Sequence, residues 1–431
     1  MNILKKKYKS SLLHISSYLF LLIPVFLITG PFLSDLALSL ISIFFLVEVF
    51  RNKKFEYFNN KFFYFFITFY IYLILNSVLQ NQNIDSLKIS LGYLRFGIFC
   101  LAVIYIIDYN EEILKKLFNV LFFTFSILIF DGFYQFFNGE NIFGFPLNPG
   151  PRVSSFFNDE LILGSYLSRL FPIFFGLLVY LNLKLKKIDY FLSCIIFIFA
   201  EVLIYLSGER AAFFYMNLSS VFILFAISNF KKLRLIILFC SLMIILAISL
   251  LFPNTKARVF NHTANQMKLF HGMDQILLFS IQHHDLYKTA INISKDNIIF
   301  GVGVKNFRNF CSSEDYKISQ YSCNTHPHNT YIQLLSELGL IGLFFGIIII
   351  SFFTKFIINH FKYLYKKKYY LDDFQVCLMS AILITIWPLI PTGNLFNNWL
   401  NIIYYFPVGI LLWTFQIKTK NFDFKKIHNS V

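Results

Sequence analysis

Long apolar runs, separated by short polar and basic segments, recur along the whole chain. Each run is about 18 residues or longer, enough for a helix to cross a hydrocarbon core roughly 30 Å thick. The pattern therefore predicts an all-α, polytopic transmembrane bundle of about twelve helices. The expected spans are 11–28, 32–50, 62–79, 89–107, 117–133, 161–181, 190–206, 211–227, 235–251, 334–357, 374–389 and 400–415.

Two polar segments are too long to be simple connections between spans. The segment near 132–160 is rich in Gly, Pro and Asn, which favours turns that can line a cavity. The segment 252–333 is long enough to form a small domain, and its stretch 278–293 is amphipathic, as in a helix lying at the membrane surface. We therefore expect three parts: nine spans in 1–251, a large loop domain in 252–333, and three spans with a tail in 334–431.

Composition agrees with a membrane protein. Hydrophobic residues make up 57% of the 431 residues and charged residues only 14%, against about 25% charged in soluble domains. The net charge of +15 raises the possibility of nucleic-acid binding. However, the basic residues lie in short clusters between apolar runs and form no single basic face, so we expect no nucleic-acid partner.

The basic clusters predict the orientation of the chain. Segments that share the side of the N-terminus carry about 24 Lys and Arg residues, whereas the short loops on the other side hold only Lys88, Arg152 and Arg210. This asymmetry places the N-terminus in the cytoplasm, and an even number of spans returns the C-terminus there. Lys5 to Lys9 precede the first run as in a signal peptide, but no small-residue cleavage site follows, so we expect this run to remain as a span.

The cysteines divide into two groups. Cys311 and Cys323 lie twelve residues apart in the large loop and are free to pair if that loop faces an oxidising compartment. Both states stay open at this point. The other four fall within apolar spans, where a thiol behaves as a small hydrophobic group: Cys100, Cys194, Cys240 and Cys377.

Two arginines lie on the outer side beside apolar spans. Arg210, in SGERAAFF, has almost no loop around it and must lie at the membrane boundary or within the bundle. A guanidinium suits a diphosphate, although Arg210 could instead pair with Glu209 or extend to the interface. Arg152, in GPRVSSFFNDE, would usually be a solvated loop residue unless its loop folds over the same cavity. Arg95 and Arg169 are further intramembrane arginines whose partners the sequence does not name.

The third polar group is THPHNTYIQLLSELGLIG, with His326 and His328. A helix is expected to begin just after His328, which places its imidazole at the outer mouth of a span. There a neutral histidine can accept a proton from a hydroxyl, and His326 could share that role. The alternative is a histidine that only caps or packs at the helix start. Gly339 and Gly342 would suit close helix packing.

Other motifs give no support for a metal or a cofactor. His271, His283 and His284 lack metal-site spacing and are better explained as surface-loop residues. GVGVKNF at 301–307 lacks the remainder of a phosphate-binding loop and predicts a turn. The outer segments also contain no D-x-D pair. We therefore expect no cofactor and no metal.

His328, Asn329, nine further residues and Gly339 together resemble the signature of the bacterial O-antigen ligase and polymerase superfamily. SGERAAFF, NIIFGVGVKNF and RVSSFFNDELILGSYL are similar to other segments of that family. The last of these has Asp159 and Glu160 where the family has Pro and Asn. The resemblance is therefore weaker around Arg152 than in the other segments. The resemblance extends directly over about 152–346.

The resemblance implies a metal-independent membrane glycosyltransferase of the GT-C kind, in the bacterial inner membrane with a periplasmic active site. Its partners would be a polyprenyl-diphosphate-linked glycan donor, a lipid A-core or glycan acceptor, and membrane lipids. Arg210 and Arg152 would hold the diphosphate, and His328 would deprotonate the acceptor hydroxyl. We also expect His326, Asn329 and Glu337 to bind substrate.

Two other functions remain open from the sequence. A polymerase of the same superfamily would use another lipid-linked repeat unit as acceptor, and the motif and topology serve both enzymes. The ligase reading is favoured by the spacing of His328, Asn329 and Gly339 and by the single large outer loop. A transporter or flippase for lipid-linked sugars would use the arginines only to guide an anionic head group, but the chain shows no internal repeat.

Overall fold

The computed structural model describes residues 10–80, 84–182, 185–269, 277, 279–366, 368 and 370–428, with side chains as far as residue 416 in the last helix. Within these ranges the chain is helical, with two isolated β-bridges and no strand. The main helices are α1 (Ser11–Phe26), α2 (Pro31–Asn52), α3 (Lys61–Leu79), α4 (Ile84–Gly92), α5 (Leu94–Tyr109), α6 (Ile113–Asn138), α7 (Leu163–Leu181), α8 (Lys187–Leu206), α9 (Arg210–Ala226), α10 (Lys231–Leu251), α15 (Thr330–Tyr365), α16 (Asp373–Ile386) and α17 (Asn398–His428). Short helical turns are η1 (Phe55–Phe58) and η2 (Ser155–Phe157).

Each predicted span coincides with a helix, so the chain is a polytopic helical membrane protein. Within the described ranges, eight helices are long and apolar enough to cross a membrane, and α1, α9 and α16 are shorter apolar helices. The number of twelve crossings therefore stays a prediction. The expected span 89–107 is divided in the structure, because α4 and α5 meet at a break at Tyr93.

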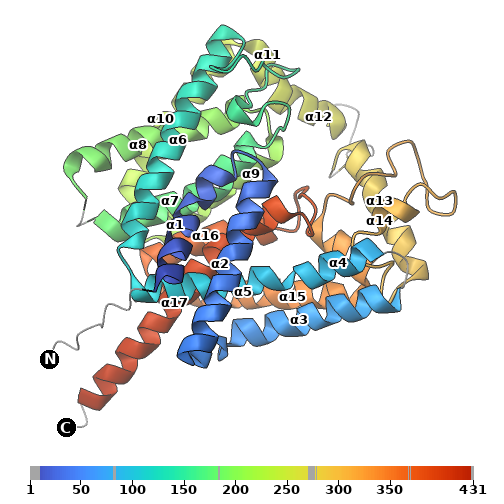
Figure 1. The fold of residues 1–431 in the computed structure, drawn as a ribbon. Coiled ribbons are helices and arrows are strands. Elements are labelled where there is room, and N and C mark those ends of the chain that lie inside the picture. The colour runs from blue at the N-terminus through green and yellow to red at the C-terminus, as the bar shows by residue number, and fades with distance from the viewer. Residues whose placement is uncertain are drawn as a thin grey trace.

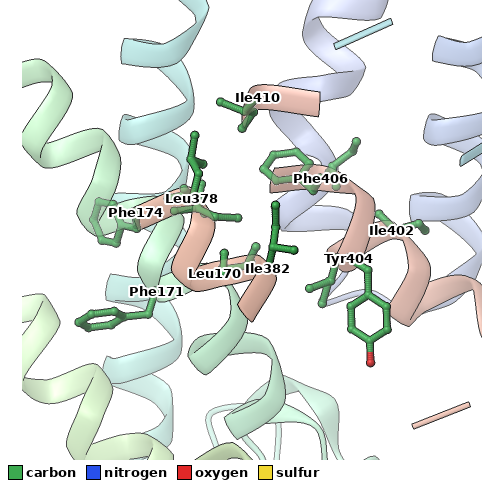
Figure 2. Packing of buried hydrophobic residues seen from close by; sticks show 14 of the residues in the cluster. Leu170, Phe171, Phe174, Leu378, Ile382, Ile402, Tyr404, Phe406 and Ile410 are labelled. Atoms are coloured by element: carbon green, nitrogen blue, oxygen red, sulfur yellow. The ribbon is translucent and has the colours of Figure 1, made fainter. Parts of the chain in front are cut away.

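The centre of the bundle is α7, which is buried along nearly its whole length. Figure 2 shows Leu170, Phe171 and Phe174 of α7 packed near Leu378 and Ile382 of α16, with α17 beside them. The outer helices differ, because α10 and α15 expose most of their apolar side chains. Such surfaces are compatible with lipid and not with water.

Two of the intramembrane arginines have partners that the sequence could not name. The guanidinium of Arg95 forms an ion pair with Asp35, with Nη2 2.8 Å from Oδ1. Arg169 is buried and lies between two aromatic rings, 4.8 Å from the centroid of Tyr215 and 4.9 Å from that of Tyr404. One of its Nη atoms also donates to the Thr385 hydroxyl at 3.4 Å.

Arg234 corrects one detail of the predicted topology. The expected span began at residue 235, which left Arg234 in the preceding basic loop, but its side chain is fully buried in the bundle. There it pairs with Glu201 at 2.5 Å, and Ser220 and Ser241 complete the hydrogen-bonded group. The difference arises because α10 begins at Lys231, so Arg234 is already within the helix and faces α8.

The segment after α10 contains α11 (Pro253–Lys256), η4 (Ala257–Asn261), α12 (His262–Gln266), α13 (Ile281–Asp296) and α14 (Phe307–Phe310). The region of α13 and α14 forms a small packed unit, whereas Val259 of η4 packs with the core of the bundle. Figure 1 shows α11 at the top and α13 and α14 at the right, all away from the C-terminal part of α17. Leu286, Ile293 and Phe307 belong to the small apolar core of this unit. Cys311 and Cys323, whose state the sequence left open, form a disulfide bond.

The amphipathic stretch is helical, as predicted, but its apolar face does not lie free at the surface. It packs into the core of this unit and against α15. Helix α13 begins at Ile281 because the Ser280 hydroxyl caps it, and Leu278 lies outside the described residues. An amphipathic pattern alone does not distinguish a protein neighbour from a lipid one.

Helix α15 is interrupted at Gly339, which has φ +67°. The Leu340 amide consequently donates to the Ile298 carbonyl at 2.8 Å, and the carbonyls of Ser336 and Glu337 accept from Val302 and Gly303. A side chain at Gly339 would overlap the backbone at Ile299. Gly339 therefore permits a break in α15 and a close approach of its backbone to that of Ile299. We had expected this glycine to allow close packing between helices.

Candidate functional site

The loop after α6 carries Arg152 to the junction of α8 and α9. Gln135, near the end of α6, accepts hydrogen bonds from the amides of Ser154 and Ser155 at 2.9 and 2.7 Å. The Val153 amide then donates to the Leu206 carbonyl at 3.1 Å. As a result the Arg152 Nε lies 3.1 Å from the Ser207 carbonyl, to which it donates. The loop thus folds against the segment that holds Arg210.

Three arginines gather at this junction, and we call Arg152, Arg210 and Arg258 the arginine cluster. Arg210 donates from Nη1 to Thr263 at 3.2 Å and to Gln266 at 2.7 Å. Arg152 and Arg258 both flank Gly208, where an added Cβ would lie 3.0 Å from the Cγ of Arg152 and 3.2 Å from that of Arg258. Segments that are far apart in the sequence therefore meet at one cationic position.

The cluster carries an excess of positive charge. Burial lowers the pKa of Arg152, the charges of Arg258 and Arg210 lower it further, and Glu209 opposes them. The Nε atom of Arg258 is buried, and it has no hydrogen-bond partner among the described residues. An unpaired buried guanidinium N–H is costly unless an anion satisfies it. The cluster therefore suits an anionic ligand.

Glu209 does not neutralise the arginine beside it in sequence. Its carboxylate accepts hydrogen bonds from the Gly164 amide at 2.6 Å, the Ser165 amide at 3.0 Å and the Ser165 hydroxyl at 2.8 Å. It thereby occupies the N-terminus of α7, a position that favours an anion. Burial raises the pKa of Glu209 to about 7, against these hydrogen bonds and the charge of Arg152. The Glu209 to Arg210 pair, the alternative considered from sequence, is not formed.

His328 lies at the mouth of α15 in a strained backbone conformation. Its φ is +55°, in the left-handed region that non-glycine residues rarely adopt. Its carbonyl accepts from the Thr392 amide at 2.8 Å and from the Tyr287 hydroxyl at 3.4 Å, which holds the strained residue from two sides. Strain of this kind is concentrated at functional positions.

The imidazole of His328 is suited to accept a proton. Burial lowers its pKa, while a hydrogen bond to the Thr392 backbone opposes that effect. The ring is therefore neutral near pH 7. A neutral imidazole carries one hydrogen, so one of its two nitrogens remains an acceptor.

His326 has a different environment, although its ring centroid lies only 4.0 Å from that of His328. Its Nδ1 is 2.9 Å from the Thr325 hydroxyl, and its Nε2 is 3.3 Å from the Thr392 carbonyl. Burial first, and then the charge of His328, lower the pKa of His326 to about 3. Both of its nitrogens are occupied, so His326 supports the site and has no free acceptor.

His283 joins the histidines to the arginines. Its ring centroid is 5.6 Å from that of His328, and the two rings meet edge to face. Burial lowers its pKa to about 4, and the charges of His328 and Arg210 both lower it further. Helix α9, which begins at Arg210, is also joined to this region, because the Tyr215 hydroxyl donates to the Pro391 carbonyl at 3.3 Å, next to the Thr392 residue that holds His328.

Two other predicted site residues have their polar groups occupied. Asn329 caps α15 by accepting from the amides of Tyr331 and Ile332, and its Nδ2 donates to the Pro388 carbonyl at 2.8 Å. Glu337 is fully buried and accepts from the amides of Lys305 and Phe307 at 3.1 and 3.3 Å. Gln333 also donates to Glu337 at 2.9 Å. This geometry gives Asn329 and Glu337 scaffolding contacts and leaves little to bind substrate.

Sequence reasoning missed three participants. His283 was interpreted as a surface residue, and Arg258 and Thr392 were not singled out. The local sequence contained one signal for His283. Ser280, three residues earlier, is a typical N-cap residue, which indicates that His283 lies in the first turn of a helix. Arg258 and Thr392 carry no local signal, because their neighbours come from distant segments.

The region that holds these groups also matches a known family. The sequence model of the O-antigen ligase family matches residues 193–347. This segment is similar to the O-antigen ligase domain. The domain includes Arg210, Arg258, His283 and His328, whereas Arg152 lies before it. The match supports membership of the O-antigen ligase and polymerase superfamily, as the sequence motifs predicted. A comparison with curated proteins found no match.

No group of three or more His, Cys, Asp or Glu side chains in the described ranges is arranged to hold a metal ion.

Proposed function

We propose that this protein is an O-antigen ligase-like, inverting glycosyltransferase that moves a glycan from a polyprenyl-diphosphate carrier to an acceptor hydroxyl on a lipid A-core or similar molecule. One observation carries the proposal. Helix α9, which begins at Arg210 of the arginine cluster, is hydrogen-bonded through Tyr215 to the Pro391 carbonyl, and the next residue, Thr392, holds the backbone of His328 with its neutral imidazole. That combination provides a position for a leaving diphosphate beside a base.

In the proposed reaction His328 takes the proton of the acceptor hydroxyl. The acceptor oxygen then forms a bond with the anomeric carbon of the donor sugar from the face opposite the diphosphate. The bond from that carbon to the diphosphate oxygen breaks, and its electron pair stays on the diphosphate. The arginine cluster stabilises the charge of the leaving group, as fixed cations do in other group transfers. Attack from the opposite face inverts the anomeric centre.

The remaining residues hold this geometry. His326, Asn329 and the backbone of Thr392 fix the loop that carries His328. Arg152 joins the cluster through its contact with Ser207, so we retain it as a donor-binding residue. Arg258 is added to that role because of its buried, unpartnered Nε.

We also propose that the site faces the periplasm from the bacterial inner membrane. The basic clusters between spans favour cytoplasmic N- and C-termini. The helices α11, α13 and α14 all lie away from α17's C-terminal part, in agreement with an outer location (Figure 1). The disulfide between Cys311 and Cys323 suits an oxidising compartment. The division into 1–251, 252–333 and 334–431 accompanies this orientation.

The test is product formation by the purified full-length protein in lipid, given lipid-linked glycan extracted from its host and the host's lipid A-core. The wild type should form a glycan linked to lipid A-core. His328→Ala should lose about 100-fold to 10,000-fold in rate, the range for removal of a general base. His284→Ala is the matched control, because it changes a neighbouring imidazole on α13 and should leave the rate within about twofold.

The outcomes separate the competing functions. Longer glycan that stays on its polyprenyl carrier would identify a polymerase. Movement of the carrier across vesicles without any new glycosidic bond would identify a flippase. Full activity in a correctly inserted His328→Ala protein would overturn the assignment of the base.

A further inference from the structure

We propose that His283 binds the sugar unit next to the diphosphate, through a hydrogen bond from its Nε2–H to an oxygen substituent beside the anomeric carbon. The inference rests on the proposed function, since it assigns a donor-specificity residue to that reaction. His283 has no part in the proton transfer described above. Its ring nevertheless contacts the ring of His328, edge to face.

The orientation of His283 is fixed by the start of its helix. Ser280 is the N-cap of α13, and its hydroxyl oxygen accepts from the His283 amide at 3.4 Å. The same hydroxyl lies 2.7 Å from Nδ1 of the His283 ring. Helix α13 is itself held by packing on α15 and by the hydrogen bond from Tyr287 to the His328 carbonyl. The ring is therefore held on a rigid element.

The proposal uses the tautomer in which the Ser280 hydroxyl donates its hydrogen to Nδ1 while its oxygen accepts from the His283 amide. The hydrogen of the neutral ring is then on Nε2. Nε2 has no hydrogen-bond partner among the described residues. It is also not fully buried, so a ligand can reach it. A preorganised donor is thus open to a ligand.

The position of the His283 Nε2–H group indicates which part of the substrate it would contact. The arginine cluster takes the diphosphate, and His328 takes the proton of the attacking hydroxyl. The anomeric carbon must lie between these groups during transfer. His283 contacts the His328 ring edge to face, so it lies beside the base that activates the attacking hydroxyl. A sugar substituent next to the anomeric carbon is the nearest acceptor that such a donor would meet.

The test uses two synthetic short-chain polyprenyl-diphosphate sugars, one with glucose and one with 2-deoxyglucose. Each is used to compete with the natural donor in the product assay, with the full-length protein in lipid. The wild type should be inhibited about tenfold more strongly by the glucose compound, the usual effect of one hydrogen bond in a closed site. His283→Phe, which keeps a ring but has no donor, should lose this preference. His283→Gln, which keeps an N–H, should retain most of it, and His284→Gln should behave as the wild type.

Loss of the preference in His283→Phe together with its retention in His283→Gln supports the proposal. A purely structural role would weaken both compounds equally and leave their ratio unchanged, which would overturn it. A wild type that does not distinguish the two compounds would also overturn it. Failure of the proposed function itself would be recognised separately, because the wild type would then form no product from the natural donor.

Discussion

His326 and His328 lie with their ring centroids 4.0 Å apart and are held by the same residue, Thr392, yet only one has a free acceptor nitrogen. His326 is bonded at both ring nitrogens, whereas His328 keeps one side open. Two neighbouring imidazoles thus have separate duties, one in holding the loop and one in accepting a proton. The Pro327 between them keeps both on the same short turn.

The pH dependence of catalysis should follow from the lowered pKa of His328. Burial moves this pKa below the ordinary value of 6.5, so the base is neutral at pH 7 and becomes protonated only as the pH falls through the lowered value. We expect kcat/KM to be flat from about pH 7 to pH 8 and to fall about tenfold per pH unit in acid. A pH profile of the wild type measures this. If activity began to fall while the pH was still above 7, during acidification, His328 with its lowered pKa could not be the base.

Arg258 should determine how tightly the donor binds. Arg258→Ala removes a guanidinium whose buried Nε has no described protein partner, so we expect the KM for the lipid-linked donor to rise about tenfold to a hundredfold. Arg258→Lys should recover only part of this loss, because an ammonium lacks the planar fork. Lys256→Ala changes an exposed cation in the preceding turn and is the control. An equal effect of both alanine substitutions would indicate general charge and no specific site.

The buried pair of Arg234 and Glu201 should matter for stability more than for chemistry. Arg234→Met leaves the carboxylate of Glu201 without its cation, at a cost of about 3–5 kcal/mol. The double variant with Glu201→Leu should regain much of that loss, because it removes both charges. Thermal unfolding in detergent measures the effect. A double variant no more stable than Arg234→Met would contradict this explanation, because the loss could then not come from the unpaired charge of Glu201.

The disulfide should stabilise the loop that leads to the histidines. Cys311→Ser opens a loop that ends three residues before His326, and chain entropy predicts a loss of about 3 kcal/mol. We expect a lower melting temperature and a loss of the sensitivity to reductant that the wild type shows. Cys194→Ser, a free cysteine in α8, is the control. Reductant that shifts the melting of Cys311→Ser as much as that of the wild type would contradict this role.

The hydrophobic pattern was sufficient to predict the helices of the bundle, because each span is a local property of about twenty residues. It could not locate the break between α4 and α5, since nothing in SLGYLRF interrupts the apolar run strongly. Arg234 was misplaced for a related reason: whether a basic residue at a helix start faces water or a buried carboxylate depends on a neighbouring helix.

The site was predictable where a motif carried it and not elsewhere. His328, Arg210 and Arg152 come from segments with recognisable patterns, and we propose that they form one site. His283 and Arg258 come from the long outer segment, where position in space depends on how that segment packs. Asn329 and Glu337 belong to the motif, but their side chains are used to cap α15 and to hold the turn at Lys305. A motif therefore indicates which residues the site requires, but it does not distinguish residues that react with the substrate from residues that hold the backbone in place.

The interruption of α15 at Gly339 links membrane insertion to the folding of the outer unit. A continuous helix satisfies its own backbone, but here the Ser336 and Glu337 carbonyls and the Leu340 amide depend on residues 298–303 of the preceding loop. Lipid offers no substitute for these hydrogen bonds. During biogenesis this crossing reaches its final form only once the loop has closed against it, so assembly of the outer unit and seating of the helix that bears His328 are one cooperative step.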